Sequence, residues 1–140
     1  MKSVAEKYQD FWNNQMYEYC YIAVDIHGTI FKPTFEKTEI FQWYPFAKTC
    51  LKELTKNPKV KLILWSGCYE DKFKDYIKKF EEEGIKFDYI NENPECVNSS
   101  YACFDKKFYF DIGIDDRFGF EPNQDWIDLL TAILVNNIYS

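Results

Sequence analysis

The chain has 140 residues, of which 46% are hydrophobic and 20% aromatic, and it carries a formal net charge of −6 with a pI near 4.8. This length suits one compact domain with a hydrophobic core and leaves no room for a second. The acidic balance argues against nucleic acid and against an anionic membrane surface as partners, because both are polyanions. No apolar stretch approaches the roughly 20 residues that span a bilayer, so we expect no membrane partner.

The five cysteines favour a reducing compartment. Their number is odd, they lack Cys-x-x-Cys spacing, and several lie within apolar runs, so we expect buried reduced thiols rather than disulfides or a zinc site. The start of the chain is polar and amphipathic and does not resemble a signal peptide. Both features predict a cytoplasmic protein.

Residues 1–18 are predicted to form an amphipathic helix ahead of the main domain. Apolar side chains recur there at helical spacing, at Val4, Tyr8, Phe11, Trp12 and Met16. Two interpretations stay open: this face packs on the chain's own domain, or it forms the contact of a homodimer. In both, residues 19–140 form a single domain.

Strands and helices are predicted to alternate through the rest of the chain. In order they are a strand at 21–24, a flap over 30–44, a helix from Pro45 to Asn57, a strand at 60–65, a helix at 71–83 capped by Gly84, a strand at 85–90, an irregular loop at 91–105, a strand at 108–114 and a helix after Pro122. Such alternation implies a parallel sheet with right-handed crossovers and helices on both faces. The fold class is therefore α/β, a three-layer Rossmann-like domain with a central parallel sheet.

Two groups of apolar residues carry further expectations. In the last helix we expect burial of Trp126, Ile127, Leu130, Ile133 and Leu134. Several aromatic residues near the expected mouth of the site could stack on a ring of a ligand, although each one alone is more typical of a core residue. They are Phe31, Phe35, Phe41, Trp43, Tyr69 and Tyr101.

Polar side chains suited to phosphate or metal chemistry accompany three of the predicted strands. The first strand ends in Asp25-Ile26-His27-Gly28-Thr29, the second in Ser66-Gly67, and the last opens at Lys107 and ends in Asp115-Asp116-Arg117. Open α/β sheets place ligands at the carboxyl ends of their strands. A carboxylate at such a tip, followed by a glycine turn and a hydroxyl, can present a nucleophile or a metal ligand.

In this order the motifs resemble those of the haloacid dehalogenase-like (HAD) superfamily of phosphohydrolases. The family pattern is Asp-x-Asp-Gly-Thr, a strand ending in Ser or Thr, a Lys, and a strand ending in an acidic pair, and the match spans residues 19–117. The small capless members from bacteria and phages are especially similar. The resemblance implies a HAD-like domain with no cap, to which the N-terminal helix is an addition.

The resemblance also implies a nucleophile and a metal site. Asp25 would attack phosphorus to form an aspartyl-phosphate, which water then hydrolyses. Mg²⁺ prefers oxygen ligands, and it would be held by Asp25 and Asp115, with Asp116 as a direct or indirect partner and the main-chain carbonyl of His27 as a further ligand.

The remaining motif residues would bind the ligand's phosphate. By the same resemblance, Ser66 would donate a hydrogen bond to a phosphoryl oxygen and Lys107 would neutralise its charge. The surrounding turns and Arg117 complete the expected ligand contacts, which are Gly28, Thr29, Ser66, Gly67, Lys107 and Arg117.

His27 departs from the family pattern, because the family has a second Asp at this position. That carboxyl serves as the general acid and base, so the change should spare the metal site and alter proton transfer. Imidazole, with an ordinary pKa near 6.5, is able to take that role. A nearby dication opposes its protonated form, and His27 could instead contact the ligand.

Two functions follow from these residues. The first is a Mg²⁺-dependent phosphohydrolase that acts on a small phosphorylated metabolite or nucleotide-like molecule, with Asp25, His27, Ser66 and Lys107 as catalytic residues. The second is a HAD-like binding protein that has lost turnover and recognises or sequesters a phosphorylated, nucleotide-like ligand. The fold alone does not decide between them.

Overall fold

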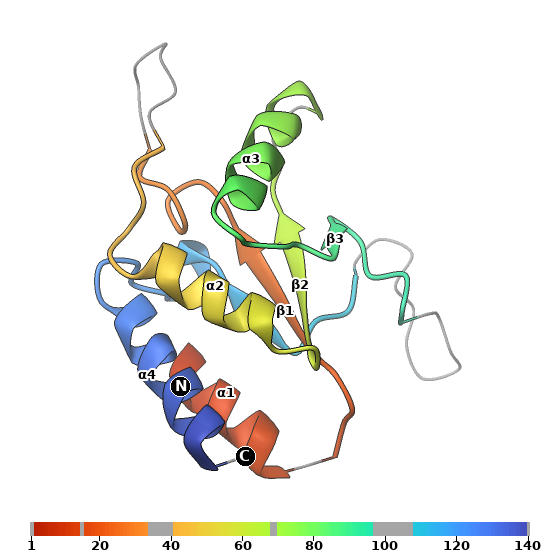
Figure 1. The fold of residues 1–140 in the computed structure, drawn as a ribbon, viewed down its shortest axis with the longest axis vertical. Coiled ribbons are helices and arrows are strands. Elements are labelled where there is room, and N and C mark those ends of the chain that lie inside the picture. The colour runs from red at the N-terminus through yellow and green to blue at the C-terminus, as the bar shows by residue number, and fades with distance from the viewer. Residues whose placement is uncertain (1, 15, 34–40, 68–69, 97–107, 140) are drawn as a thin grey trace.

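The structure, a computed structural model, describes residues 2–14, 16–33, 41–67, 70–96 and 108–139 (Figure 1). Its elements are, in chain order, α1 (Val4–Asn14), β1 (Cys20–Asp25), α2 (Ala47–Lys56), β2 (Val60–Trp65), α3 (Glu70–Glu82), β3 (Tyr89–Ile90), β4 (Ile112–Ile114), the 3₁₀ helix η1 (Asp116–Phe118) and α4 (Asp125–Tyr139). None of the described helices is long and apolar enough to cross a lipid bilayer.

The strands form one parallel sheet of four strands in the order β3-β2-β1-β4. The register sets Asp25 of β1 level with Trp65 of β2, and Val24 of β1 level with Ile114 of β4. The predicted α/β class with a Rossmann-like central sheet is therefore confirmed. Because all four strands run in one direction, the residues after β1, β2 and β4 meet at the same edge.

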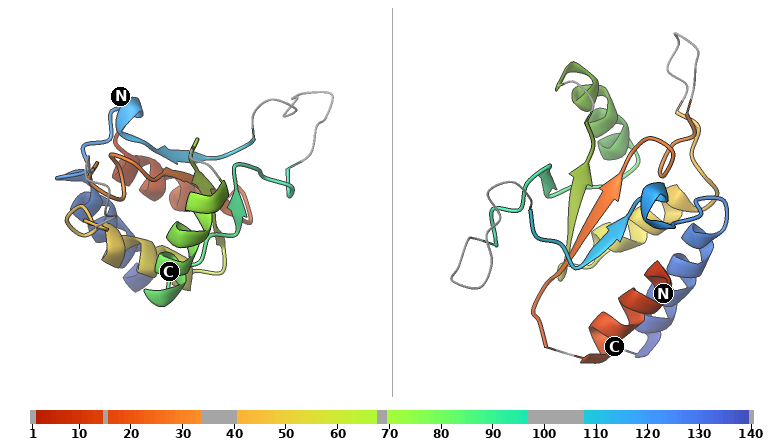
Figure 2. Two further views of the ribbon diagram at one scale, coloured as in Figure 1. Left: turned by 90° about the horizontal axis from the view of Figure 1, so that it is seen from above. Right: turned by 180° about the vertical axis from the view of Figure 1, so that it is seen from behind.

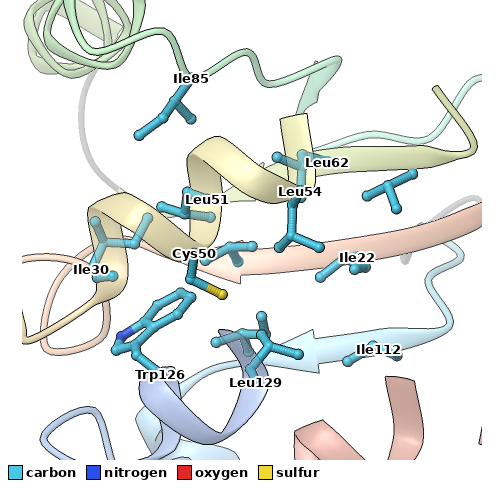
Figure 3. Packing of buried hydrophobic residues seen from close by; sticks show 14 of the residues in the cluster. Ile22, Ile30, Cys50, Leu51, Leu54, Leu62, Ile85, Ile112, Trp126 and Leu129 are labelled. Atoms are coloured by element: carbon cyan, nitrogen blue, oxygen red, sulfur yellow. The ribbon is translucent and has the colours of Figure 1, made fainter. Parts of the chain in front are cut away.

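The core lies against one face of the sheet. Side chains at alternate strand positions point to the same face, so Ile22 and Val24 of β1 join those of β2 and β4 in one hydrophobic cluster. Figure 3 shows Leu51 and Leu54 of α2 and Leu129 of α4 in the same packed cluster as Ile22 of β1. All four helices contribute residues to this cluster, which anchors the strands and hence the site at their ends.

Helix α1 packs against α4, and the two run side by side in Figures 1 and 2. Tyr8 on its apolar face is fully buried, and Val4, Phe11 and Trp12 pack against the same core. The apolar face of α1 is thus used within the chain's own domain. Met16, which lies beyond the end of the helix, is 73% exposed.

Two strands are shorter than the sequence predicts. The strand expected at 85–90 comprises only Tyr89–Ile90, and the strand expected at 108–114 only Ile112–Ile114. An aspartate precedes each of these strands, and its side chain takes part in the hydrogen bonding of the sheet. Asp88 Oδ2 accepts the Leu62 N–H at 2.9 Å, and Asp111 Oδ2 accepts the Tyr21 N–H at 2.8 Å. A carboxylate there replaces the carbonyl that another strand residue would provide.

The prediction that five apolar residues of α4 are buried is wrong for two of them. Trp126, Leu130 and Ile133 are buried as expected, but Ile127 is 37% exposed and Leu134 is 44% exposed. The helix is apolar on more than one side, so its composition does not define which stripe faces inward. The packed stripe runs through Trp126, Leu129, Leu130 and Ile133, at the i, i+3, i+4, i+7 spacing of one helix face.

The two ends of the predicted flap pair with each other. The Lys32 N–H donates to the Gln42 carbonyl at 2.8 Å, and the Tyr44 N–H donates to the Ile30 carbonyl at 3.0 Å. Between them, residues 34–40 lie outside the described part of the chain, as does most of the loop predicted at 91–105. Cys20 and Cys50 are free and buried, as expected for reduced thiols, while Cys96 is half-buried.

Candidate active site

The predicted site residues meet at the carboxyl edge of the sheet. Asp25 is the last residue of β1, Ser66 follows β2, and Asp115 follows β4. Since β1 lies between β2 and β4, the carboxylate of Asp25 occupies the centre of this edge. A cavity of about 450 Å³ opens there, and the described residues that line it are Asp25, His27, Ser66, Gly67, Asp116 and Arg117.

A tight turn follows β1 and brings the chain back over the strand tip. The Ile26 carbonyl accepts hydrogen bonds from the N–H groups of Ile30 and Phe31, at 2.9 and 3.1 Å. Gly28 has a φ of 76° in this turn, and a Cβ added to it would lie 3.0 Å from Asp116 Oδ2. Glycine is therefore needed both for the left-handed backbone and for the approach of Asp116.

Thr29 ties the two acidic strand tips together. It is fully buried, and its Oγ1 lies 3.3 Å from both Asp25 Oδ2 and Asp116 Oδ1 while it accepts the Asp116 N–H at 3.1 Å. The Thr29 carbonyl accepts a 2.9 Å hydrogen bond from Trp126 Nε1. Helix α4 thus holds the turn in place from the core side.

Three carboxylates converge at this point. Asp25, Asp115 and Asp116 each offer an oxygen, and these oxygens lie within 4.8 Å of one another. Burial, followed by the negative charge of Asp115, raises the pKa of Asp25 to about 6, although Arg117 opposes the shift. The concentrated negative charge makes the ionised state of Asp25 costly unless a cation is close.

Among the described residues, Arg117 brings a positive charge to this cluster. Its Nη2 and Nε donate to the two carboxylate oxygens of Asp115 at 2.8 and 3.2 Å, and its backbone N–H donates to Oδ1 at 2.9 Å. Burial opposes ionisation of Asp115, but these hydrogen bonds outweigh it and hold the pKa of that carboxyl below its usual range. The guanidinium also lies 5.7 Å from the ring centroid of Trp65.

The donor set fits a hard divalent cation. All three side chains offer carboxylate oxygens, which suit Mg²⁺, and among the described residues they form the group assigned as able to hold a metal. Burial first, and then the charge of Asp115, raise the pKa of Asp25, and a dication bound to its carboxylate would offset both effects. Arg117 shares the oxygens of Asp115, so it would compete with such an ion.

Ser66 is held by a residue of the neighbouring strand. Asn91 follows β3, accepts the Ser66 N–H on Oδ1 at 2.9 Å, and donates from Nδ2 to the Ser66 carbonyl at 2.8 Å. Its amide thus continues the pairing of β2 with β3 by one residue. The backbone of Asn91 is left-handed, with a φ of 54°, a conformation that Asn tolerates better than most residues.

His27 bonds to helix α3. Its Nε2 lies 2.8 Å from the hydroxyl of Tyr76, and the two rings meet edge to face at a centroid distance of 5.4 Å. The imidazole is exposed and lines the cavity, so it is both anchored and accessible.

Comparison with solved structures finds a relative of similar length. A conserved protein coded by a locus from Bacteroides thetaiotaomicron shares 31% sequence identity and superposes with a TM-score of 0.64, over 87% of this chain and 98% of that one. The chain belongs to the family of this Bacteroides protein. No protein-family model matches the chain, and no curated protein sequence matches it.

In the present chain, the structure brings together most of the site residues that the sequence predicted. Around one cavity edge lie Asp25, His27, Gly28, Thr29, Ser66, Gly67, Asp115, Asp116 and Arg117. Lys107 lies outside the described residues, so its predicted contact with phosphate stays a prediction.

Three positioning residues were not predicted: Asn91, Tyr76 and Trp126. Asn91 could have been recognised, because an Asn directly after a predicted strand is a typical left-handed position. The hydrogen bonds of Tyr76 and Trp126 link segments 49 and 97 residues apart, and no local pattern indicates them.

The aromatic residues expected at the mouth divide into two sets. Phe31, Phe41 and Trp43 pack with one another and with helix α3, and Phe31 is only 4% exposed. The other three, Phe35, Tyr69 and Tyr101, lie outside the described residues. Among the described residues, a different set of aromatic side chains lines a neighbouring cavity that shares Ser66 and Gly67 with the site: Trp65, Phe108, Phe110 and Phe118.

Proposed function

We propose that the chain is a Mg²⁺-dependent phosphohydrolase of the HAD-like type, acting on a small phosphorylated molecule. The observation that carries the proposal is the cluster of Asp25, Asp115 and Asp116 oxygens within 4.8 Å at the carboxyl edge of the sheet. Ser66 borders the same cavity and is 7% exposed. A carboxylate nucleophile, a cation site and a hydroxyl donor within one cavity are the parts that phosphoryl transfer requires.

In the proposed reaction, a carboxylate oxygen of Asp25 attacks phosphorus as the bond from phosphorus to the leaving oxygen breaks. That oxygen keeps the bonding electron pair and takes a proton, and water then cleaves the aspartyl-phosphate to release phosphate and restore Asp25. Mg²⁺, bound by Asp25, Asp115 and Asp116, would offset the negative charge of the phosphate and carboxylates. Ser66, positioned by Asn91, donates to a phosphoryl oxygen.

The protonation state of Asp25 suits this role near neutrality. With a pKa of about 6, most of its carboxyl groups are ionised at pH 7, so the nucleophilic form dominates. That value holds without metal, and a bound dication would lower the pKa of Asp25 and keep its carboxylate ionised below pH 6 as well.

A second candidate, a binding protein for a phosphorylated ligand, draws on a different observation. His27, at the position of the proton donor, is bonded to Tyr76, and both oxygens of Asp115 are engaged by Arg117. In this candidate the anion and metal sites persist and proton transfer is lost.

The nucleophile is tested with Asp25→Asn and a matched control, Asp128→Asn. Asp128 is an exposed carboxylate in the first turn of α4 and does not line the cavity of the site. Phosphate release from p-nitrophenyl phosphate should be abolished by Asp25→Asn and unchanged by Asp128→Asn. Wild-type turnover in the Asp25→Asn protein would exclude the aspartyl-phosphate mechanism.

A further inference from the structure

A second cavity, of about 550 Å³, lies beside the acidic site and shares Ser66 and Gly67 with it. Its other described lining residues are Trp65, Asn91, Phe108, Phe110 and Phe118, and we call this cavity the aromatic pocket. A volume of this size is within the range of small-molecule sites. The two cavities therefore adjoin at Ser66 and Gly67.

Four rings from three separate segments form the walls of the aromatic pocket. The centroid of Trp65 lies 5.5 Å from Phe118, 5.9 Å from Phe108 and 6.1 Å from Phe110. Phe118 remains 51% exposed, so its ring is available for a further contact. Aromatic rings favour offset or edge-to-face contacts at such distances, which a planar ligand ring would extend.

Gly113 of β4 leaves space for two of these rings. A Cβ added at Gly113 would lie 2.9 Å from Phe110 Cε2 and 3.4 Å from Phe118 Cδ2. Only glycine lets both phenyl groups lie this close to the strand. The pocket is thus formed with its rings already placed.

Asn91 and Arg117 already use hydrogen-bonding groups within the protein, which limits the hydrogen bonds that they can offer to the polar atoms of a ligand ring. Asn91 lines it, but both ends of its amide are bonded to the backbone of Ser66. The guanidinium of Arg117 lies over Trp65 at 5.7 Å and is bonded to Asp115, at the border with the acidic site. Recognition by the described residues therefore depends on ring faces and apolar area.

We propose that the aromatic pocket binds a planar aromatic ring, so that the molecule recognised is a phosphate monoester carrying such a ring. Its phosphate lies in the acidic site beside Asp25, and its ring contacts Trp65 and Phe118. This inference rests on the proposed function, since it uses the same phosphate position. A nucleoside monophosphate and an aryl phosphate share this chemistry.

The test measures equilibrium binding in the presence of Mg²⁺, using the Asp25→Asn protein so that no ligand is consumed. The probes are phenyl phosphate, adenosine and cytidine 5′-monophosphates, and glycerol 3-phosphate as the ringless reference. Stacking contributes about 1–3 kcal/mol per ring, so ring-bearing probes should bind at least about fivefold more tightly than the reference. Adenosine and cytidine monophosphates should differ less from each other than either differs from the reference.

Phe118→Ala should remove most of that preference, and Phe118→Leu should remove nearly as much, because an aliphatic side chain offers area without a ring face. Phe46→Ala is the matched control, since Phe46 is 52% exposed and borders neither cavity. It should keep the full preference. Both positions are exposed, so the variants are expected to fold.

Equal affinity for phenyl phosphate and glycerol 3-phosphate would overturn the inference, as would an undiminished preference in Phe118→Ala. Tighter binding of the nucleotides than of phenyl phosphate identifies the ring as a nucleobase, and the reverse identifies an aryl ester. Hydrolysis is assayed separately with the wild-type protein. A ring preference without phosphate release would count against the phosphohydrolase proposal alone, and release without a ring preference against this inference alone.

Discussion

The hydroxyl of Tyr76 lies 2.8 Å from Nε2 of His27, and this contact joins helix α3 to the turn after β1. Tyr76 is 8% exposed and stacks on Phe31 at a centroid distance of 5.8 Å, so the tyrosine is itself anchored in the core. A neutral imidazole that accepts a hydrogen bond from the tyrosine hydroxyl at Nε2 carries its own proton at Nδ1. The orientation of the His27 ring is therefore governed from α3.

His27 separates the two candidate functions. A leaving oxygen of a sugar or ribose must be protonated as it departs, and a placed general acid contributes about 10²–10⁴-fold to the rate. If His27 is that acid, His27→Ala should slow hydrolysis of such esters by this factor and affect p-nitrophenyl phosphate far less. If the acid is disabled, His27→Asp should create or sharply raise hydrolysis. Steady-state phosphate release with both ester types measures the outcome.

Tyr76→Phe is the companion variant for His27, because it removes the hydroxyl and keeps the ring that packs on Phe31. With a working acid, it should shift the pH dependence of hydrolysis of poor leaving groups while leaving the fold intact. An unchanged rate in His27→Ala, His27→Asp and Tyr76→Phe would assign His27 to ligand contact or structure.

Arg117 and Mg²⁺ should compete for Asp115. Replacing Arg117 by Gln leaves a fully buried carboxylate without its charged partner, which should lower the unfolding free energy of the metal-free protein. Mg²⁺ should restore much of this loss and bind more tightly than in the wild type. Thermal unfolding and calorimetric titration with Mg²⁺ measure both effects.

The Mg²⁺ experiment has a surface control and a site control. Lys56→Gln breaks the exposed ion pair with Glu53 and should change stability by less than about 0.5 kcal/mol. Asp115→Asn should weaken Mg²⁺ binding strongly. Unchanged Mg²⁺ affinity in Asp115→Asn would remove the metal assignment, and weaker binding in Arg117→Gln would show that Arg117 supports the ion.

Asp25 should destabilise the metal-free fold above pH 6. Its folded pKa of about 6 exceeds its ordinary value of 3.8, so the folded state loses stability as pH rises from about 4 to about 6. Asp25→Asn avoids this cost and should have a higher Tm at pH 7.5. Asp25 is partly exposed to solvent, which reduces the cost of burying its charge beside Asp115, so we expect a rise on the order of 3 °C, which corresponds to about 1 kcal/mol.

Melting curves of wild type and Asp25→Asn at pH 4 and pH 7.5, with a chelator present, provide the measurement. Titrating groups away from the site cancel in the difference between the two proteins, and what remains is the effect of Asp25 together with its charged neighbours Asp115, Asp116 and Arg117. The gain in Tm should therefore be confined to the higher pH. An equal difference at both pH values would mean that the pKa of Asp25 is not raised by its surroundings.

Asn91 should position Ser66 for phosphate binding. Asn91→Gly suits the left-handed backbone but loses both hydrogen bonds to Ser66, whereas Asn91→Ala loses the bonds and adds backbone strain. We expect both to cost about 1–3 kcal/mol, with Ala the less stable. Both should weaken phosphate binding several-fold at unchanged Mg²⁺ affinity. Phosphate binding at the wild-type level in Asn91→Gly would show that Ser66 needs no support from β3.

The local features of this chain follow from residues that are neighbours in the sequence. The mostly apolar runs that lead to Asp25, Trp65 and Ile114 define β1, β2 and β4, since the strands of a parallel sheet are typically rich in apolar residues. Gly84, with a φ of 76°, ends the region of α3 as predicted. These signals act between neighbours along the chain, so the residue type alone constrains the backbone.

Which of these elements contact one another depends on the tertiary structure. Whether β4 lies beside β1, and hence whether Asp115 reaches Asp25, depends on the strand order. Helix α4 is apolar on more than one side, so its sequence does not show which face packs against the core, and Ile127 is exposed in the structure. The aromatic pocket gathers Trp65, Phe110 and Phe118 from segments with no shared periodicity. Contacts of this kind depend on register and packing across the sheet, and a linear pattern of residues does not carry that information.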